Sequence, residues 1–344
     1  MIHKTRWYED SASDISPIIS SRVRLARNLS KYPFSAKIND EQSEKLIKDV
    51  ISSIKNDYMS IGSQFEYVDI KNADGTDKRA LIEKHSISPE LLKYSRPRGV
   101  LIKEDESVEI MINEEDHIRI QSVYSGKNID AAWDTADKID DLMEETLEYA
   151  FDSDFGYLTS CPTNTGTGLR ASYMVHIPML EKTGNIQSLA AALSKLGMTI
   201  RGIYGEGSES YGSIYQVSNQ MTLGKSEEEI IQGLKTIGEQ IEDNESKVFK
   251  NIYSENPIYV EDNIYRAYGL LKNARKMTVK EAMNLLSAVR TGYIFGILKE
   301  PKPKAPIYNI MMNIEPGNIQ KRTGESDSDK RDIARASYLR EIFN

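Results

Sequence analysis

The sequence predicts an α+β fold, in which helices flank a mostly antiparallel sheet and an all-helical C-terminal domain follows. Short segments that alternate apolar and polar residues, or are rich in β-branched and aromatic residues, have the character of strands. These segments come in groups that long stretches of helical periodicity interrupt, an order typical of an antiparallel sheet with helices on one face. Beyond Asn256-Pro257 only helical patterns remain, so we place a domain boundary at about residue 255.

The expected elements can be placed in order along the chain. A short polar segment, residues 1–17, precedes an extended segment that starts at Ile18. A first helix is expected over Asp40–Asp57, where apolar residues recur at helical spacing. Later strands are expected over Gln64–Lys71, Ser107–Asn113, His117–Tyr124, Gly156–Thr159, Met198–Tyr204 and Ser213–Leu223. Later helices are expected at about residues 130–150, 186–196, 226–253, 260–274, 279–298 and 328–342, with a proline-rich break at 299–306. The chain then divides into an α+β domain, residues 18–255, and a helical domain, residues 256–344.

Composition excludes several classes of protein. The chain has 344 residues, 39% of them hydrophobic and 28% charged, as ordinary globular proteins have. No apolar run approaches the roughly 18 residues of a membrane helix, and the first residues lack an apolar secretion signal. A single cysteine, Cys161, excludes internal disulfides, and with four histidines it argues against structural zinc. We expect a cytoplasmic protein with no membrane partner and, because the net charge is −8, no direct nucleic-acid partner.

The segment Asn113–Gln121, NEEDHIRIQ, places three acids and a histidine directly after the apolar run Ile110–Ile112. If the strand continues through it, Glu115, His117 and Arg119 share one face. Glu115 and Arg119 would then lie about 13 Å apart, at roughly 3.3 Å per residue. A base at one end and a phosphate clamp at the other would suit phosphoryl transfer. By itself, however, the segment is more typical of a solvated strand end with ordinary surface charges.

Two glycine-containing segments offer further candidates. In Thr159–Met174, TSCPTNTGTGLRASYM, Asn164 and the two glycines permit a tight turn with positive φ after Cys161. Free backbone N–H groups in such a loop would suit a phosphate or an oxyanion, although a turn around an inert cysteine is the alternative. Arg201–Ser210, RGIYGEGSES, has the features of a loop that carries Glu206 to a cleft, or of a plain surface hairpin.

Five arginines lie at or beside the expected strand–loop junctions: Arg22, Arg24, Arg119, Arg170 and Arg201. Guanidinium groups bind phosphates in a bidentate manner, and lysines are scarce at these junctions. The set as a whole therefore predicts a site for a nucleoside triphosphate, which no single motif does.

Together these motifs resemble a known family. NEEDH with Arg119 after it, CPTN-x-GTG at Cys161–Gly168, and SSRVRLARN from Ser20 resemble the catalytic domain of phosphagen (guanidino) kinases, which include creatine and arginine kinases. The resemblance spans about residues 18–253 and implies the glutamine-synthetase-like fold of that domain. Those kinases carry a helical domain before the arginine motif, and because only about 20 residues precede Arg22 in this sequence, we expect no counterpart of it. A helical segment with Arg331-Asp332-Ile333-Ala334-Arg335-Ala336 follows instead, and both departures resemble bacterial protein-arginine kinases.

The resemblance implies roles for particular residues. Glu115 would be the catalytic base, Glu206 a second carboxylate near the acceptor guanidinium, and Cys161 a neighbour of that group. The implied ATP-binding residues are Ser20, Ser21, Arg22, Val23, Arg24, His85, Arg119, Arg170, Ala171, Ser172, Tyr173, Met174, Arg201, Gly202, Ile203, Tyr204, Gly205 and Glu206. The reaction class implies Mg²⁺, although no cluster of metal ligands is visible. The segment Arg331–Ala336 would bind phosphoarginine and activate the enzyme allosterically, whereas its residues alone indicate a solvated helix face.

The resemblance also implies partners. The acceptors would be proteins with exposed arginines, marked in this way for proteolysis during stress. A zinc-binding activator, a Clp-type protease and a second copy of the chain would be partners. Two other functions stay open at this stage. One is a kinase of free arginine or another small guanidino compound, and the other is a non-catalytic adaptor that binds phosphoarginine through Arg331–Ala336.

Overall fold

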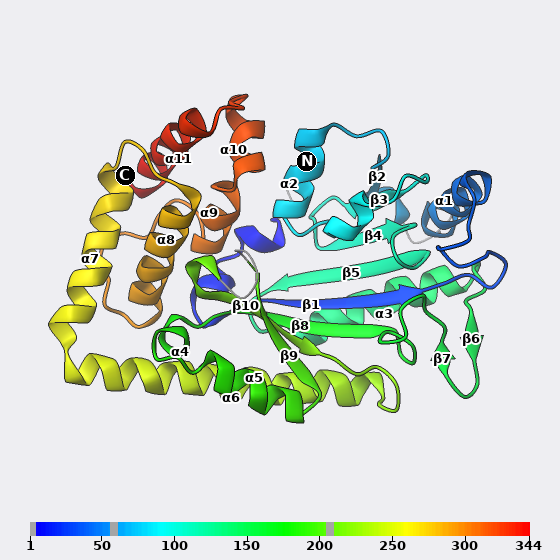
Figure 1. Cartoon of the computed structure of the whole chain (residues 1–344), viewed down its shortest axis with the longest axis horizontal. Coiled ribbons are helices and arrows are strands. Elements are labelled where there is room, and N and C mark those ends of the chain that lie inside the picture. The colour runs from blue at the N-terminus through cyan, green and yellow to red at the C-terminus, as the bar shows by residue number, and fades with distance from the viewer. Residues whose placement is uncertain (1–4, 56–60, 204–209) are drawn as a thin grey trace.

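The computed structural model describes residues 5–55, 61–203 and 210–344, and within these an antiparallel sheet forms the centre of the molecule (Figure 1). Its strands are β1 Ile18–Arg27, β2 Phe65–Asp69, β3 Gly99–Lys103, β4 Val108–Ile112, β5 Ile118–Ser125, β8 Leu169–His176, β9 Met198–Gly202 and β10 Ile214–Asn219. They lie in the order β2-β3-β4-β5-β1-β8-β10-β9, and each neighbouring pair is antiparallel. A separate hairpin joins β6 Phe151–Asp152 to β7 Gly156–Tyr157.

Helices flank this sheet, and after residue 256 the described chain consists of helices without strands. The helices before residue 256 are α1 Asp40–Lys55, α2 Gly75–Glu83, α3 Ile129–Glu144, α4 Pro178–Lys182, α5 Ile186–Lys195 and α6 Glu227–Glu255. The later ones are α7 Pro257–Asn273, α8 Val279–Ile294, α9 Ile307–Asn313, α10 Pro316–Thr323 and α11 Ser328–Phe343. This arrangement confirms the predicted α+β fold class with a helical C-terminal region. In the described residues, no helix has the length and apolarity that crossing a membrane requires.

One face of the sheet carries the main hydrophobic core. Alternate residues of the central strands, such as Val23 and Leu25 of β1 and Ile118 and Ile120 of β5, are fully buried there. Helices α1, α3, α5 and α6 cover this face with apolar residues at helical spacing. The expectation of helices on one face is therefore confirmed for these four helices. Since side chains alternate along a strand, the residues between the core positions must point to the opposite face.

The opposite face is only partly covered. The C-terminal helices pack on one end of it, where Ile19, Met174 and Ile214 join a second hydrophobic cluster with α7, α8 and α9. A smaller cluster under α2 covers Val100 and Met111 of β3 and β4. Helix α10 packs against α2, so that the two coverings meet at the top of Figure 1. No helix of the described residues covers the middle of this face, and the polar side chains of β1, β5, β8 and β10 lie there.

The N-terminal segment ties the two parts of the chain together. Trp7 packs against Tyr308 of α9, with ring centroids 5.8 Å apart. The buried guanidinium of Arg290 in α8 donates to the carbonyl groups of Ser13 and Ser16. The carboxylate of Asp14 accepts the backbone N–H of Ile307 at 3.0 Å. Residues 5–17 are therefore a structural part of the molecule, because their contacts connect the sheet to the C-terminal helices.

Several elements differ from the sequence-based expectation. Strands β3, β6 and β8 and helices α2, α4, α9 and α10 were not predicted, and the expected strand Gly156–Thr159 is paired only at Gly156–Tyr157. The largest difference is β8, which lies at the centre of the sheet beside β1. Its alternation of Leu169, Ala171 and Tyr173 is a strand signal, but the glycine-rich loop just before it led us to treat the whole segment as a loop. Helix α6 ends and α7 begins around Asn256, where we expected a domain boundary, and that boundary stays a prediction.

Candidate active site

The sheet brings four of the predicted arginines together on its open face. Arg22 and Arg24 alternate with the core residues of β1, so both point away from the core. In the register of the sheet, Arg24 lies opposite Arg170 of β8 on one side and Gln121 of β5 on the other. Arg119 lies opposite Ala26, two residues further along β1. The arginines of three adjacent strands therefore form one cationic surface.

Among the described residues, Arg22, Arg24 and Arg170 form no ion pair with a carboxylate, whereas Arg119 pairs with Glu114 at 2.7 Å. Burial and the neighbouring arginines lower the pKa of Arg22 to about 10 and that of Arg24 well below its ordinary value. Burial, Arg201 and Arg119 lower the pKa of Arg170 too. Arg22 donates to Gln216 at 2.5 Å and Arg170 to Ser218 at 3.2 Å, both neutral acceptors. The Nε of Arg24 has no hydrogen-bond partner in the described part of the chain. A polyanion bound on this surface would supply the missing negative charge.

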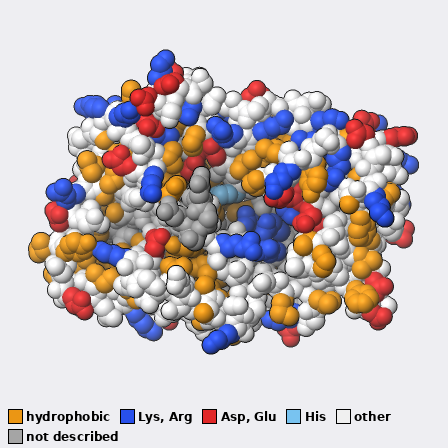
Figure 2. All heavy atoms as spheres, in the orientation of Figure 1, with side chains coloured by type: hydrophobic (Ala, Val, Ile, Leu, Met, Phe, Trp, Pro, Cys, Tyr) orange, Lys and Arg blue, Asp and Glu red, His pale blue; other side chains and the backbone are white. Residues whose placement is uncertain are grey.

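A cavity of about 560 Å³ lies over this surface. Arg22, Arg24, Arg119 and Arg201 line it together with the apolar side chains of Ile82, Ile87, Pro89, Met111 and Ile203. Figure 2 shows Lys and Arg side chains gathered in a hollow near the middle of the face, beside a histidine and bordered by acidic side chains. Its size, cationic wall and apolar wall suit a ligand with both phosphates and an aromatic base. We did not predict the apolar wall, since it comes from separate turns and strand ends.

His85 lines this cavity in an unusual backbone conformation. Its φ is 61°, and its carbonyl accepts the side-chain amide of Gln121 at 2.8 Å, which fixes the turn to β5. Burial, with Arg22 nearby, lowers the pKa of His85 to about 3. The ring is therefore neutral and adds no charge to the arginine surface.

The NEEDH segment is a tight turn, and here the sequence-based expectation was wrong. Strand β4 ends at Ile112 and β5 begins at Ile118, and Asn113 turns the chain with a φ of 61°. The two charged groups therefore do not lie at opposite ends of an extended segment, because Arg119 Nη2 lies 3.8 Å from Glu115 Oε2. His117 does not share their face, because its Nδ1 accepts the N–H of Leu29 at 3.0 Å while Nε2 lies 2.9 Å from the Pro33 carbonyl. Because Nδ1 accepts a hydrogen bond and Nε2 faces a carbonyl, the proton lies on Nε2, the ring is neutral and the role of His117 is structural.

The other acids of the turn have structural partners. Glu114 is buried and accepts Arg119 at 2.7 Å and the Ser88 hydroxyl at 2.5 Å. Asp116 is buried as well and accepts the Asn28 side chain at 2.7 Å and the N–H of Ser160 at 2.6 Å. Glu115 alone is held loosely, with 38% of its side chain exposed. The turn thus uses two carboxylates to position the third.

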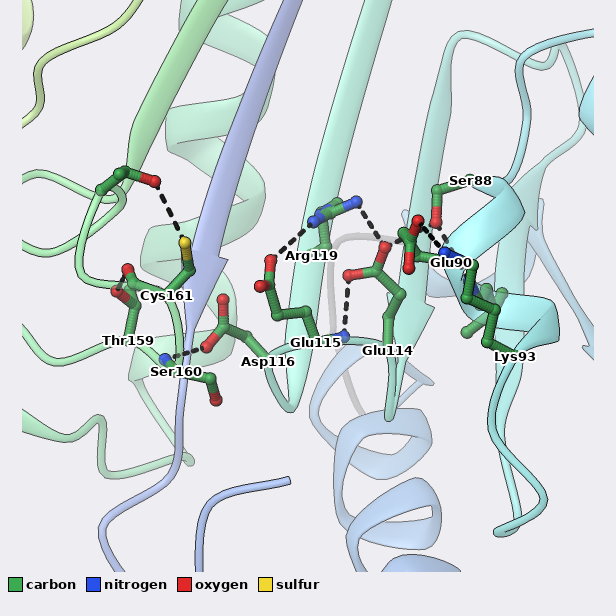
Figure 3. Close-up of polar contacts among 12 residues, drawn as sticks. Ser88, Glu90, Lys93, Glu114, Glu115, Asp116, Arg119, Thr159, Ser160 and Cys161 are labelled. Carbon is green, nitrogen blue, oxygen red and sulfur yellow. Dashed lines mark hydrogen bonds and ion pairs between the residues drawn. The ribbon is translucent and has the colours of Figure 1, made fainter. Parts of the chain in front are cut away.

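Glu115 faces a small pocket of about 130 Å³. Figure 3 shows its carboxylate pointing toward Arg119, with Cys161 on the neighbouring loop and Asp116 tied to Ser160. Cys161, Thr163 and Asn164 form the opposite wall, and Arg24, Arg119 and Arg170 form the side toward the larger cavity. Burial and the nearby Asp116 and Glu114 carboxylates raise the pKa of Glu115, and Arg119 opposes this. The pocket has the size for a planar group, and the Glu115 carboxylate offers a cationic group an anionic partner, next to the arginines on which a polyanion would bind.

The CPTN-x-GTG loop shapes this pocket through its side chains. Gly166 and Gly168 adopt the expected positive φ, at +116° and +66°, whereas Asn164 does not. The expected free backbone N–H groups are largely absent among the described residues. Those of Asn164 and Thr165 bond within the loop, and that of Thr167 bonds the carbonyl of Thr222. The loop is therefore no phosphate cradle, and it presents Cys161 and Asn164 instead, with the Cys161 sulfur 3.0 Å from the Thr163 hydroxyl.

Comparison with known proteins agrees with this geometry. Residues 43–248 match the family model of the ATP:guanido phosphotransferase C-terminal catalytic domain, and residues 257–344 match that of the protein-arginine kinase McsB C-terminal domain. A protein-arginine kinase of Caldanaerobacter subterraneus subsp. tengcongensis is 44% identical over 96% of this chain and 98% of its own length. The chain belongs to the protein-arginine kinase family. A second family member, from Clostridium kluyveri, is 46% identical over 94% of each chain.

Solved structures share the fold at lower identity. The crystal structure of a lombricine kinase superposes with a TM-score of 0.61 at 23% identity, covering 72% of this chain and 70% of that one. A duplicated taurocyamine kinase from Schistosoma mansoni, with bound components of a transition-state analogue, has a TM-score of 0.62 at 22% identity. It covers 92% of this chain and 48% of its own. The guanidino kinase fold of the protein-arginine kinase family is thus present here.

Only alternate members of the predicted ATP-binding segments reach the open face. Val23, Ala171 and Tyr173 lie in the core beneath the sheet, and the Ser21 hydroxyl donates to the Gly126 carbonyl. Ser20, Ser172 and Met174 lie on the open face, around a small space beside Trp7. Gly202 and Ile203 line the large cavity with Arg201. The predicted Tyr204, Gly205 and Glu206 lie outside the described residues, and the roles of all these residues remain predictions.

The RDIARA segment lies on α11, and its two arginines differ. Arg335 is buried, and its guanidinium donates to the carbonyls of Ile314 at 2.7 Å and Met277 at 2.9 Å and to the Asp332 carboxylate. Arg331 is more accessible and donates to the Ser326 carbonyl. Ile333 is half-exposed, Ala334 is partly exposed, and Ala336 packs in the C-terminal core. Of the two guanidinium groups, only that of Arg331 is placed for a ligand without rearrangement, and the predicted phosphoarginine site is untested.

The described residues contain no group of three or more His, Cys, Asp or Glu side chains that could hold a metal ion. Mg²⁺ commonly binds proteins through substrate phosphates, water and only one or two carboxylates. The cationic cavity therefore suits a magnesium ion that enters as part of the nucleotide complex.

Replacing Gly168 with alanine tests the loop geometry. A Cβ at Gly168 would lie 2.6 Å from the Ala26 carbonyl oxygen and 2.6 Å from Arg27 Nη1, in addition to the strain of a positive φ. We expect Gly168→Ala to lower the free energy of unfolding by about 1–3 kcal/mol and to reduce activity by displacing Cys161. Gly184→Ala is the control, because Gly184 has a similar φ of +72° and nothing within 4 Å of its Cβ position. Equal losses for both variants, measured by thermal denaturation, would show that the close contact is unimportant.

Proposed function

We propose that this chain is an ATP-dependent protein-arginine kinase, which transfers the γ-phosphoryl group of ATP to the guanidinium of arginine side chains in proteins. One observation carries the proposal. A small pocket with Glu115 and Cys161 on its walls adjoins a cation-lined cavity, and the two share Arg24 and Arg119. A guanidinium in the first and a triphosphate in the second would meet at those two arginines.

The arginine surface would bind and align the nucleotide. Arg22, Arg24, Arg119 and Arg170 would neutralise phosphate charge, and Mg²⁺ brought by the nucleotide would neutralise the remainder. Their fixed positions on three adjacent strands leave little reorganisation to occur during transfer. Alignment of the γ-phosphorus with the acceptor nitrogen, and stabilisation of charge on the equatorial oxygens, supply most of the catalysis in such reactions.

Glu115 would accept the proton of the acceptor. The guanidinium of arginine has a pKa above about 12, so it is protonated and poorly nucleophilic before reaction. A bond forms between its terminal nitrogen and the γ-phosphorus while the bond to the β–γ bridging oxygen breaks, and ADP leaves with that electron pair. The nitrogen loses a proton in the same step, and the Glu115 carboxylate receives it. The raised pKa of Glu115 makes it a stronger base than an ordinary carboxylate.

The rest of the pocket would orient the guanidinium. Cys161 and Asn164 face Glu115 across it and can accept hydrogen bonds from the planar fork. Arg119 is held by its 2.7 Å ion pair with Glu114, which keeps one guanidinium nitrogen in place and leaves Glu115 the weaker partner. The same arginine can therefore contact a phosphate without withdrawing the base from the acceptor.

Further properties of the family belong to the same proposal. Acceptor proteins with exposed arginines, a zinc-binding activator, a Clp-type protease and a homodimer are its proposed partners. Marking proteins for proteolysis during stress in the cytoplasm is its proposed role. Phosphoarginine binding at Arg331–Ala336 would add regulation by product. The support for these is membership of the protein-arginine kinase family and the match of residues 257–344.

The test compares two acceptors. The chain is incubated with Mg²⁺ and ATP and either a casein-like protein or free arginine, and phosphate is located by mass spectrometry under neutral conditions. We expect acid-labile phosphate on arginine residues of the protein. Phosphate on free arginine alone would assign a small-guanidino kinase. Absence of transfer to either, with retention of arginine-phosphorylated protein, would assign an adaptor.

A further inference from the structure

A carboxylate from the C-terminal helices reaches the nucleotide cavity. Glu315 is the residue before α10, and it lines the cavity together with Arg22, His85 and Gln216. It belongs to the segment matched by the protein-arginine kinase C-terminal model and not to the sheet that carries the arginines. Nothing in our sequence analysis marked it, because it lies in a segment, Ile314-Glu315-Pro316, with no recognisable motif.

Glu315 differs from its acidic neighbour, Glu83. The two oxygens of Glu83 accept the N–H groups of Gly317 and Asn318, at 2.7 and 2.8 Å, and so join α2 to the start of α10. Among the residues that the structure describes, no donor lies within hydrogen-bond distance of the Glu315 carboxylate. Burial and Glu83 raise the pKa of Glu315 to about 8, and Arg335 opposes this only in part. The carboxylate thus lines a ligand cavity without donors of its own.

The position of Glu315 indicates which part of a nucleotide it meets. The γ-phosphate must lie at the end of the cavity that is shared with the guanidinium pocket, beside Arg24 and Arg119. Glu315 does not line that pocket, and neither do Ile82 and Ile203, which are apolar parts of the cavity wall. The nucleoside must therefore extend toward Glu315. A carboxylate would repel phosphates, whereas hydroxyl groups donate hydrogen bonds to it, and such bonds would favour its ionised form against the effect of burial.

We propose that Glu315 binds the ribose of ATP, accepting hydrogen bonds from the vicinal 2′- and 3′-hydroxyl groups. The two hydroxyls match the two oxygens of one carboxylate, and acidic side chains recognise ribose in this way in other nucleotide folds. The inference rests on the proposed function, in which ATP is the phosphoryl donor. It makes the C-terminal helices part of the nucleotide site.

The packing around Glu315 supports this role. The buried guanidinium of Arg335 donates through Nε to the carbonyl of Ile314, directly before Glu315, at 2.7 Å. Glu83 holds the two residues that follow Pro316. Glu315 is therefore fixed on both sides by buried polar contacts. Arg335 acts on the cavity through this backbone and is a positioning residue.

The experiment measures dissociation constants by calorimetry on the full chain with Mg²⁺. The ligands are ATP, 2′-deoxyATP, 3′-deoxyATP and ITP, which lacks the amino group of adenine. We expect the parent to bind each deoxy analogue about tenfold more weakly than ATP. Glu315→Ala should bind ATP about as weakly as the parent binds the deoxy analogues and should not discriminate among the three. Glu315→Gln, which preserves the shape, should discriminate less than the parent and serves if the alanine variant does not fold.

Glu325→Gln is the matched control, since Glu325 lies on the same helical domain, contacts Lys330 at 3.8 Å and does not line the cavity. It should retain the discrimination of the parent. Equal binding of ATP and its deoxy analogues by the parent would overturn the ribose assignment, as would undiminished discrimination in both Glu315 variants. If the parent bound ITP more weakly than ATP, and Glu315→Ala bound the two equally, the carboxylate would be reassigned to the adenine amino group. Failure of the parent to bind or use ATP would instead refute the proposed function.

Discussion

Glu115→Gln should lower kcat for protein phosphorylation by about 10²- to 10⁴-fold, the range that general bases usually contribute. The amide has the shape of the carboxylate but cannot accept the proton of the guanidinium. ATP affinity should hardly change, because Glu115 lines the small pocket and not the nucleotide cavity. Stability should change little too. The only ion pair of Glu115 in the described residues is the 3.8 Å contact to Arg119, which has a closer partner in Glu114.

The pH profile provides an independent readout for the same variant. A base works only when deprotonated, and the pKa of Glu115 is raised by burial and by its acidic neighbours. The kcat/KM of the parent should therefore rise with pH through that raised pKa, and Glu115→Gln should lose this limb. Glu325→Gln is the control, because Glu325 contacts Lys330 at 3.8 Å, lies outside the pocket and is not among the charges that shift the pKa of Glu115. A Glu115→Gln variant with the rate of the parent would remove Glu115 from the mechanism.

The sequence predicted the arginine surface because strand periodicity transfers directly into space. Arg22 and Arg24 are two residues apart, and any strand places such side chains on one face. That Arg170 lies opposite Arg24 could not be predicted, since pairing of β8 with β1 depends on long-range register. The alternation in β8 is nonetheless visible in the sequence and would have placed Arg170 on the same face.

The site around Glu115 was less predictable. The sequence analysis expected separate strands at Ser107–Asn113 and His117–Tyr124, and it placed Glu115, His117 and Arg119 on one face only if a strand continued through NEEDH. Instead, a tight turn at Asn113 brings Glu115 to Arg119 and turns His117 into the interior. Asparagine is one of the few residues that readily accepts a positive φ, so the turn left a weak signal. Glu315 left none. Its contribution to the cavity depends on the docking of α10 against α2 through Glu83, a contact between residues more than two hundred positions apart.

Arg24→Met should have opposite effects on activity and on stability. We expect kcat/KM to fall by about 10³-fold or more, the scale on which arginines stabilise phosphoryl transfer. The melting temperature of the free protein should rise, by an amount equivalent to roughly 1 kcal/mol. Arg24 faces three other arginines, its pKa is held well below the ordinary value by burial and by those charges, and its Nε has no partner in the described chain. Removing it relieves repulsion that only the nucleotide would otherwise offset.

Arg27→Met is the matched control, three residues along the same strand and on the other face. Arg27 donates to Asp140 at 2.6 and 3.0 Å, and both side chains are buried. Its loss leaves a buried carboxylate without its cation, which costs about 3–5 kcal/mol, so this variant should melt at a lower temperature. Saturating Mg²⁺ and ATP should then raise the melting temperature of the parent and of Arg27→Met but hardly that of Arg24→Met. If Arg24→Met were destabilised like Arg27→Met, the arginine surface would be structural. A higher melting temperature for Arg24→Met and a lower one for Arg27→Met are expected only if the arginine cluster destabilises the free protein and serves to bind the triphosphate.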